Sequence, residues 1–308
     1  MNTKQILTFI TLAETSNYIK AADRLNYAPS TLAKHIRSLE EELGTKLVEH
    51  RENRIRLTRE GERFYAYAQK MMETYWEAME KVADPACLTG GVRIAGGEPI
   101  VGFSLSPFLL DFSNQYPKVS VNVQMICCAR VPAWLRGREV DMGYIYEMEQ
   151  LEDDVFERVS LYNEPVWLVT TPGNPLAERE QVCYQDLQDQ KFAFTYDDCC
   201  FTMAFRDRMR QRGIAPASEL FLGSVSAVIN SVTQSDRIAL IPHSTLPHIP
   251  GVSGLVRLNW VDEPLRSWVQ IVYDKNRHLS HVEKEMIRQA RQYAAALVEH
   301  DGEGQLHA

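Results

Sequence analysis

The chain has 308 residues, 45% of them apolar, and a formal net charge of −8. This length allows two or three domains with buried cores, and the acidic balance excludes a protein that is basic throughout. Apolar runs stay well short of the ~20 residues that a membrane-spanning helix needs. Thr8, Thr11 and Glu14 interrupt the apolar residues of the first segment. We therefore expect no signal peptide and a cytoplasmic protein.

Charge is distributed unevenly along the chain. Residues 1–59 carry ten Lys or Arg against seven Asp or Glu, whereas residues 85–308 carry 20 basic against 28 acidic side chains. A mildly basic head thus precedes an acidic body. Any contact with nucleic acid is expected in the head.

Helical periodicity dominates the first 44 residues. The spacing predicts helices over 3–14 and 18–26, and a third from Pro29 to Gly44. Proline suits the first helical position because its missing N–H would be unpaired there anyway. An apolar stripe should face inward on the third helix: Leu32, Ile36, Leu39 and Leu43. Polar side chains remain for its outward face: Ser30, Thr31, Lys34, His35, Arg37 and Ser38.

A hairpin and a long helix should follow. Residues 46–58 read as two short strands with a turn at Asn53, which places Arg51, Arg54 and Arg56 near the tip. A helix over 59–81 carries apolar residues every three to four positions. These residues are Phe64, Ala68, Met71, Tyr75, Met79 and Val82. The stripe favours pairing with a second copy of the helix. Docking on the chain's own body is the alternative.

The pattern changes after a break at Asp84-Pro85 and a joint at Gly90-Gly91. Strands and helices then alternate, which predicts an α/β body of two similar halves, with the chain returning to the first half at its end. Expected strands are 92–95, 119–126, 142–146, 166–171, 192–195, 219–222, 238–241 and 267–273. Expected helices are 103–115, 132–138, 201–213, 226–233 and 281–299.

The N-terminal residues resemble a LysR-type transcriptional regulator, with more than fifteen positions in register over about 60 residues. The matching positions are Phe9, Ala13, Tyr18, Ala21, Ala22, Leu25, Ser30, Thr31, Ile36, Leu39, Glu40, Leu43, Gly44, Leu47, Leu57, Thr58 and Gly61. Body segments fit as well: Pro107–Phe112, Tyr116-Pro117, Val140–Met142, Pro175–Ala177 and Ile238–Pro242. The chain departs from the family pattern at Pro29, Ala33, His50 and Ser235–Arg237.

The resemblance implies an α+β multidomain fold. It comprises a winged helix-turn-helix (1–59), a linker and dimerisation helix (60–84), a hinge (85–91) and a two-subdomain α/β effector domain like a periplasmic binding protein (92–308). Subdomain I would hold about 92–165 and 266–308, and subdomain II about 166–265. The implied function is transcription regulation through double-stranded DNA and a small-molecule effector. The chain would form a homodimer and homotetramer and act indirectly on RNA polymerase, with no cofactor, metal or membrane.

Roles for single residues follow from the same resemblance. The third helix would enter the major groove with Ser30, Thr31, Lys34 and His35 toward base edges. Arg37, Arg51, Arg54 and Arg56 suit phosphates. The effector would lie between the subdomains, touching Gly97, Glu98, Pro99, Ile100, Cys127, Cys128, Arg130, Asp198, Cys199, Cys200, Phe201, Ser224 and Ser226. Because Arg130 is the one cation placed there, this acidic set favours an amine, a zwitterion or a cation over a simple carboxylate.

Two other function classes remain open at this stage. The vicinal pairs Cys127-Cys128 and Cys199-Cys200 permit a thiol-based sensor of oxidant, soft metal or sulfur compound, although free cysteines are usually just buried. The α/β body alone permits a plain solute-binding module. An enzyme pairing Cys199 or Cys200 with His243 has no local signature to support it, so no catalytic residue is predicted.

Overall fold

The computed structural model describes residues 1–25, 27–51, 54–82, 88–149, 153–248, 254–277 and 279–303. The predicted turn at Asn53 and break at Asp84-Pro85 lie outside the described residues, as do the side chains of Arg51, Arg54, Met79 and Val82. Two compact units divide the chain: residues 1–87 with 278–281, and residues 88–277 with 282–308. Across the described ranges, no helix is long and apolar enough to cross a membrane.

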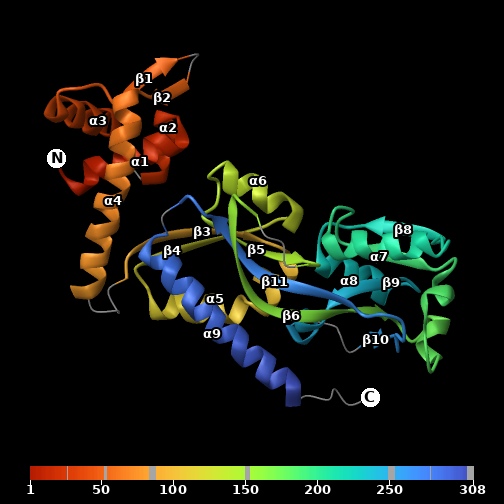
Figure 1. Ribbon diagram of the computed structural model, residues 1–308. Coiled ribbons are helices and arrows are strands. Elements are labelled where there is room, and N and C mark those ends of the chain that lie inside the picture. The colour runs from red at the N-terminus through yellow and green to blue at the C-terminus, as the bar shows by residue number, and fades with distance from the viewer. Residues whose placement is uncertain are drawn as a thin grey trace. The chain divides into compact units, whose positions relative to one another are not determined.

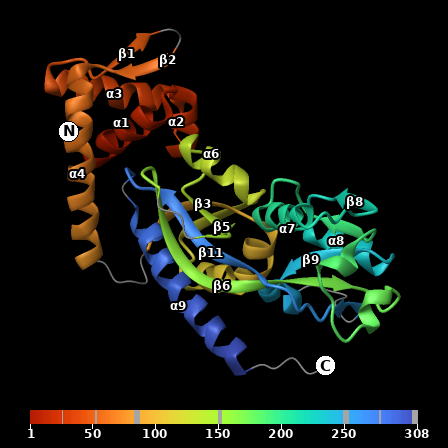
Figure 2. The ribbon, with the colours of Figure 1, turned by 45° about the vertical axis from the view of Figure 1, so that its right-hand side comes forward.

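The first unit is a helix-turn-helix with a two-stranded wing and a long helix (Figures 1 and 2). Its elements are α1 (Thr3–Thr15), α2 (Tyr18–Leu25), α3 (Pro29–Leu43), β1 (Val48–Arg51), β2 (Arg54–Leu57) and α4 (Arg59–Val82). The strands pair antiparallel, with Val48 opposite Leu57. The helices and the hairpin predicted from periodicity, and the winged helix-turn-helix that the resemblance implies, are thereby confirmed.

Apolar side chains from all three short helices form the core of this unit. Phe9, Leu32 and Leu39 are fully buried, and Ile36 is nearly so. The expectation for Leu43 was wrong, because its side chain is 39% exposed. The buried side chain at this end of α3 is that of Glu40.

Glu40 closes the connection from α3 to the wing. Its Oε1 accepts hydrogen bonds from the backbone N–H groups of Leu47 (2.9 Å) and Val48 (3.3 Å), and its Oε2 accepts one from Lys46 Nζ at 2.6 Å. The carboxylate is therefore buried among donors that the turn would otherwise leave unpaired. This local requirement explains why Glu40, and not Leu43, faces inward.

Helix α4 presents two apolar lines instead of one. Ala68 and Met72 are buried against the first unit. Met71 and Tyr75, predicted in the same stripe as Ala68, are 43% and 37% exposed, and Tyr67 is 63% exposed. The exposed line, Tyr67-Met71-Tyr75, repeats every four residues and so lies along one side of the helix.

The second unit contains one nine-stranded mixed sheet in the order β4-β3-β5-β11-β6-β9-β7-β8, with β10 pairing β6. Its strands are β3 (Gly90–Gly96), β4 (Val119–Met125), β5 (Met142–Glu147), β6 (Phe156–Thr170), β7 (Lys191–Phe194), β8 (Ser218–Phe221), β9 (Ile238–Pro242), β10 (Val256–Arg257) and β11 (Leu265–Asp274). Its α-helices are α5 (Ser106–Gln115), α6 (Val131–Arg136), α7 (Cys200–Gln211), α8 (Val225–Thr233) and α9 (His281–Glu303).

Two long strands join the halves of this unit, as Figures 1 and 2 show. β6 runs for 15 residues, pairs with β11 along most of its length and pairs with β9 only from Val166 onward. The predicted strand 166–171 was too short. Asn163 and Pro165 resemble strand breakers locally, but the antiparallel partner β11 extends the strand past them.

The chain returns to its first half as predicted. Helix α9 packs on α5, with the rings of Phe108 and Tyr293 5.8 Å apart, and the Tyr116 hydroxyl donates to Glu285 at 2.9 Å. The helix predicted over 103–115 is instead split into a π-helix, Pro99–Ser104, and α5. Pro107 lies in the first turn of α5, where its lack of an N–H is tolerated.

Candidate DNA-binding surface and effector site

The N-terminal half of α3 carries the predicted DNA contacts. Ser30, Lys34 and Arg37 are exposed, whereas Thr31 and His35 are partly buried. These side chains alternate with the buried residues of α3, so the core fixes the face that they share. The exposed Ser30 and Lys34 and the partly buried Thr31 offer the donors and acceptors that base edges recognise.

His35 is held in one orientation by α1. Its Nδ1 lies 3.0 Å from the hydroxyl oxygen of Thr8, and that hydroxyl donates to the Lys4 carbonyl at 2.6 Å. This contact ties the imidazole ring of His35 to α1. Tyr27 packs edge-on against the same ring at 5.4 Å.

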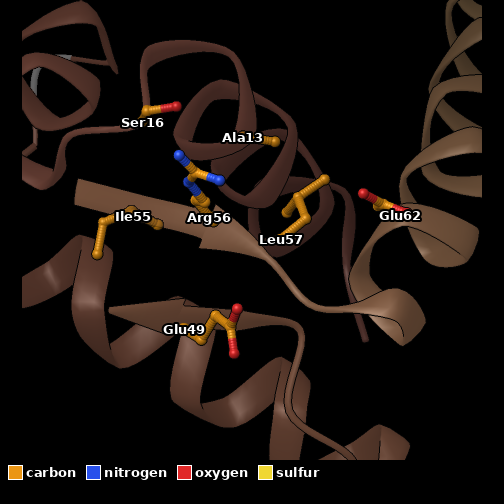
Figure 3. A pocket seen from close by; sticks show the side chains of 7 residues that line it. All are labelled: Ala13, Ser16, Glu49, Ile55, Arg56, Leu57 and Glu62. Atoms are coloured by element: carbon orange, nitrogen blue, oxygen red, sulfur yellow. The ribbon is translucent and has the colours of Figure 1, made fainter. Parts of the chain in front are cut away.

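Arg56 lies in a pocket at the base of the wing (Figure 3). The pocket has a volume of about 390 Å³ and includes Ser16, Glu49 and Glu62. Arg56 stands directly opposite Glu49 across the hairpin, and Figure 3 shows its guanidinium directed toward Ser16 at the end of α1. Two carboxylate side chains thus line the same pocket as this cation. Arg51 and Arg54 form the last backbone pair of the hairpin, at its tip.

In the second unit, the loop after β3 reaches across to α8. Gly97, Pro99 and Ile100 are buried, whereas Glu98 is partly exposed. The Glu98 Oε2 accepts a hydrogen bond from the backbone N–H of Val225 at 2.6 Å, and its Oε1 accepts from the Ser224 hydroxyl at 3.2 Å. The structure therefore brings the predicted residues Glu98 and Ser224 together from different subdomains.

A second contact between the subdomains joins the turn after β4 to the loop before α7. The Cys127 thiol donates to Asp198 Oδ1 at 3.0 Å, and Arg130 Nε lies 3.7 Å from Asp198 Oδ2. The Arg130 guanidinium also lies 6.0 Å from the Tyr196 ring centroid. Tyr196 was not among the predicted residues, although it directly precedes the acidic pair in the sequence. Phe201 is buried and packs edge-on against Tyr146 at 5.7 Å.

Their surroundings raise the pKa of three cysteine thiols in this region. Burial, assisted by Asp198, raises the pKa of Cys127 to about 12, and burial raises the pKa of Cys128 to about 12. Burial also raises the pKa of Cys199 well above its ordinary value, with Cys200 adding to the effect. Because the thiolate is the reactive form, this environment disfavours rapid oxidation of these three side chains. Among the described residues, no group of three or more His, Cys, Asp or Glu is arranged to hold a metal ion.

Sequence reasoning missed a buried carboxylate on the connecting strand β6. Glu164 is 4% exposed; its Oε1 accepts from the Tyr146 hydroxyl at 2.9 Å, and its Oε2 from the Ser244 backbone N–H at 2.7 Å. Glu164 lies between Asn163 and Pro165, directly ahead of the predicted strand 166–171. His243, the residue weighed as a catalytic base, packs its ring on Trp167 at 4.3 Å.

Comparison with known proteins agrees with this architecture. Residues 3–62 match the family described as bacterial regulatory helix-turn-helix protein, lysR family, and residues 88–295 match the LysR substrate binding domain. An uncharacterized HTH-type transcriptional regulator of Bacillus subtilis, YwqM, is 29% identical over 282 residues, covering 91% of this chain and 95% of that protein.

Solved structures show the same fold. A cysteine mutant of Corynebacterium glutamicum OxyR superposes with a TM-score of 0.62 at 21% identity, covering 98% of this chain and 96% of that one. Full-length CbnR, solved in complex with its target DNA, superposes with a TM-score of 0.53 at 18% identity over 96% and 100% of the two chains. With both domains matched in order, this chain belongs to the LysR family of transcriptional regulators, which join a helix-turn-helix DNA-binding domain to an effector-binding domain.

Proposed function

We propose that the exposed face of α3 reads the operator in the major groove. The observation that carries this proposal is the set Ser30, Thr31 and Lys34, which the buried residues Leu32 and Ile36 hold on one side of the helix. Ser30, Thr31, Lys34 and His35 meet base edges, and Arg37 meets phosphate. Arg51 and Arg54 at the wing tip add phosphate contacts. Arg56, with Glu49 and Glu62 nearby, contributes less to DNA affinity than Arg37.

In this proposal two copies of the chain form a homodimer through the exposed line Tyr67-Met71-Tyr75 on α4. Two such dimers then assemble into a homotetramer. Two heads then meet half-sites about 34 Å apart or a multiple of that distance. Regulation reaches RNA polymerase indirectly, through the spacing of the heads and the bending of DNA. Such a regulator works in the cytoplasm, beside the chromosome, and we propose no enzymatic activity for it.

Binding to the DNA beside the chain's own gene tests the first proposal. Fluorescence anisotropy with a salt titration should show affinity falling steeply as salt rises. Lys34→Ala should weaken binding by about tenfold, whereas Glu41→Ala, an exposed change on the same helix, should not weaken it. Equal affinity of Lys34→Ala and the wild type would reject α3 as the reading helix.

The effector in this proposal binds between the subdomains. The residues concerned are Gly97, Glu98, Pro99, Ile100, Cys127, Cys128, Arg130, Asp198, Cys199, Cys200, Phe201, Ser224 and Ser226. Glu98, Asp197 and Asp198 against Arg130 favour a ligand that carries an amino group. A thermal-shift screen should give larger rises in melting temperature for amines and amino acids than for simple carboxylates, because a ligand of the native state stabilises it. The opposite ranking would reject this charge argument.

A further inference from the structure

The N-terminus of α8 is occupied by a carboxylate from the other subdomain. Three donors converge on Glu98: the Val225 backbone N–H at 2.6 Å, the Ser224 hydroxyl at 3.2 Å and the Ser226 hydroxyl at 3.4 Å. Glu98 follows β3 in subdomain I, whereas α8 belongs to subdomain II. These bonds therefore connect segments 126 to 128 residues apart in the chain.

This arrangement is the one in which a helix would bind an external anion. The first N–H groups of a helix have no partner within it, and the helix dipole adds partial positive charge at the same end. Ser224 also accepts from Ala227 N–H at 3.5 Å, so its hydroxyl proton is free to point at Glu98. Val225 is 1% exposed and Glu98 is partly exposed, so this bond to the carboxylate is partly buried.

We propose that Glu98 is a specificity-determining residue that acts as an internal anion. Its carboxylate closes the subdomain junction at the α8 N-terminus and excludes carboxylate and phosphate groups of effectors from that position. An effector of the wild-type protein must then bind without hydrogen bonds from the N-terminus of α8. The inference rests on the proposed effector site and adds to it a reason for the exclusion of anions.

Chemical rescue tests the proposal in the full-length protein. Glu98→Ala should lower the melting temperature by several degrees through loss of three hydrogen bonds to a charged group. Sodium formate should raise the melting temperature of Glu98→Ala by at least ~2 °C relative to sodium chloride at equal ionic strength, because the vacated donors can bind it. Wild type and Glu139→Ala, which removes an exposed carboxylate from the same subdomain, should show no difference between the two salts.

Two results would overturn the proposal: no formate-specific rise in Glu98→Ala, or an equal rise in the wild type. Should Glu98→Ala not fold, Glu98→Gln decides, because it keeps the shape and removes the charge. Hydrogen exchange of the peptide covering 222–230 should be faster in Glu98→Gln, and unchanged exchange would reject the internal anion. The thermal-shift screen of the wild type is read separately, so a missing preference for amines with intact formate rescue in Glu98→Ala would reject only the proposed effector class.

Discussion

Single polar residues determine how α3 and the wing are held. His35 is fixed by Thr8 from α1, and Glu40 ties α3 to the first residues of β1. Neither contact involves an apolar side chain, although both lie at the edge of an apolar core. A buried polar group costs free energy unless it is paired, so few other side chains can replace the members of these two pairs without loss of stability.

Thr8→Val should weaken operator binding by about threefold to tenfold, because His35 loses the hydrogen-bond partner that holds its ring beside α1. Thr11→Val is the matched control, since the Thr11 hydroxyl donates to the Leu7 carbonyl at 2.8 Å in the same way that Thr8 donates to Lys4. Anisotropy with the operator fragment measures both variants, and circular dichroism checks their folding. An equal loss of operator affinity in the two variants would show that Thr8 has no role beyond that of Thr11.

Glu40→Gln should lower the free energy of unfolding by about 1–3 kcal/mol at pH 7. Burial raises the pKa of Glu40, but the hydrogen bonds from Lys46, Leu47 and Val48 outweigh it, so the pKa lies below its ordinary value of 4.5. The stabilisation is therefore present above about pH 4.5 and is lost as the pH falls through the lower folded pKa.

Urea unfolding from pH 7 to pH 3 measures this difference, with Glu41→Gln as the exposed control on the same helix. The gap between the wild type and Glu40→Gln should narrow below pH 4.5. A gap that stays constant over the whole range would show that the charge of Glu40 does not contribute.

Whole elements are placed by close backbone contacts that a helix pattern does not reveal. The first turn of α4 meets the residue that directly precedes β1 at Gly61, where an added Cβ would lie 2.0 Å from the Leu47 carbonyl oxygen. Backbone cannot move aside as a flexible side chain can. The glycine therefore sets how closely α4 approaches the wing.

Gly61→Ala should destabilise the first unit by more than about 3 kcal/mol or prevent its folding, because overpacking against backbone is severe. Gly173→Ala is the control, since its added methyl would meet nothing closer than 3.9 Å. Thermal unfolding monitored by circular dichroism compares the two variants. A Gly61→Ala protein as stable as the control would contradict the close approach.

At the scale of the whole molecule, each unit has its own core, and α4 exposes apolar surface beyond what its unit buries. Tyr67, Met71 and Tyr75 are all at least 37% exposed, whereas the neighbouring line at Ala68 and Met72 is buried. A contiguous apolar line on a helix is typical of a surface that pairs with another helix. Tyr67, Met71 and Tyr75 therefore form the surface through which we propose that two copies of the chain pair.

Met71→Glu should shift the protein toward monomers and lower operator affinity at least tenfold, because two linked heads bind much more tightly than one. Ala66→Glu adds the same charge on an exposed side of α4 away from the Tyr67-Met71-Tyr75 line and serves as the control. Analytical ultracentrifugation and anisotropy measure mass and affinity. Unchanged mass in Met71→Glu would place the dimer contact elsewhere.

The sequence by itself determined the regular elements and their order. Period-3.6 stripes predicted α1 to α4, alternation predicted the α/β body, and the pattern around Ser30, Ile36 and Leu39 indicated the family. These signals are local, because a helix or strand repeats its buried face every few residues. The assignment of Glu98 and Ser224 to one site came from the family resemblance and not from any local pattern.

Only the tertiary structure decided which partner each polar residue takes. Sequence patterns carry no signal for the pairing of Glu98 with Val225, Cys127 with Asp198 or Glu164 with Tyr146, because these partners are far apart along the chain. The length of β6 and the burial of Glu40 in place of Leu43 were likewise fixed by neighbours in space. Long-range hydrogen bonds are selected by the packed geometry as a whole, which a one-dimensional pattern does not encode.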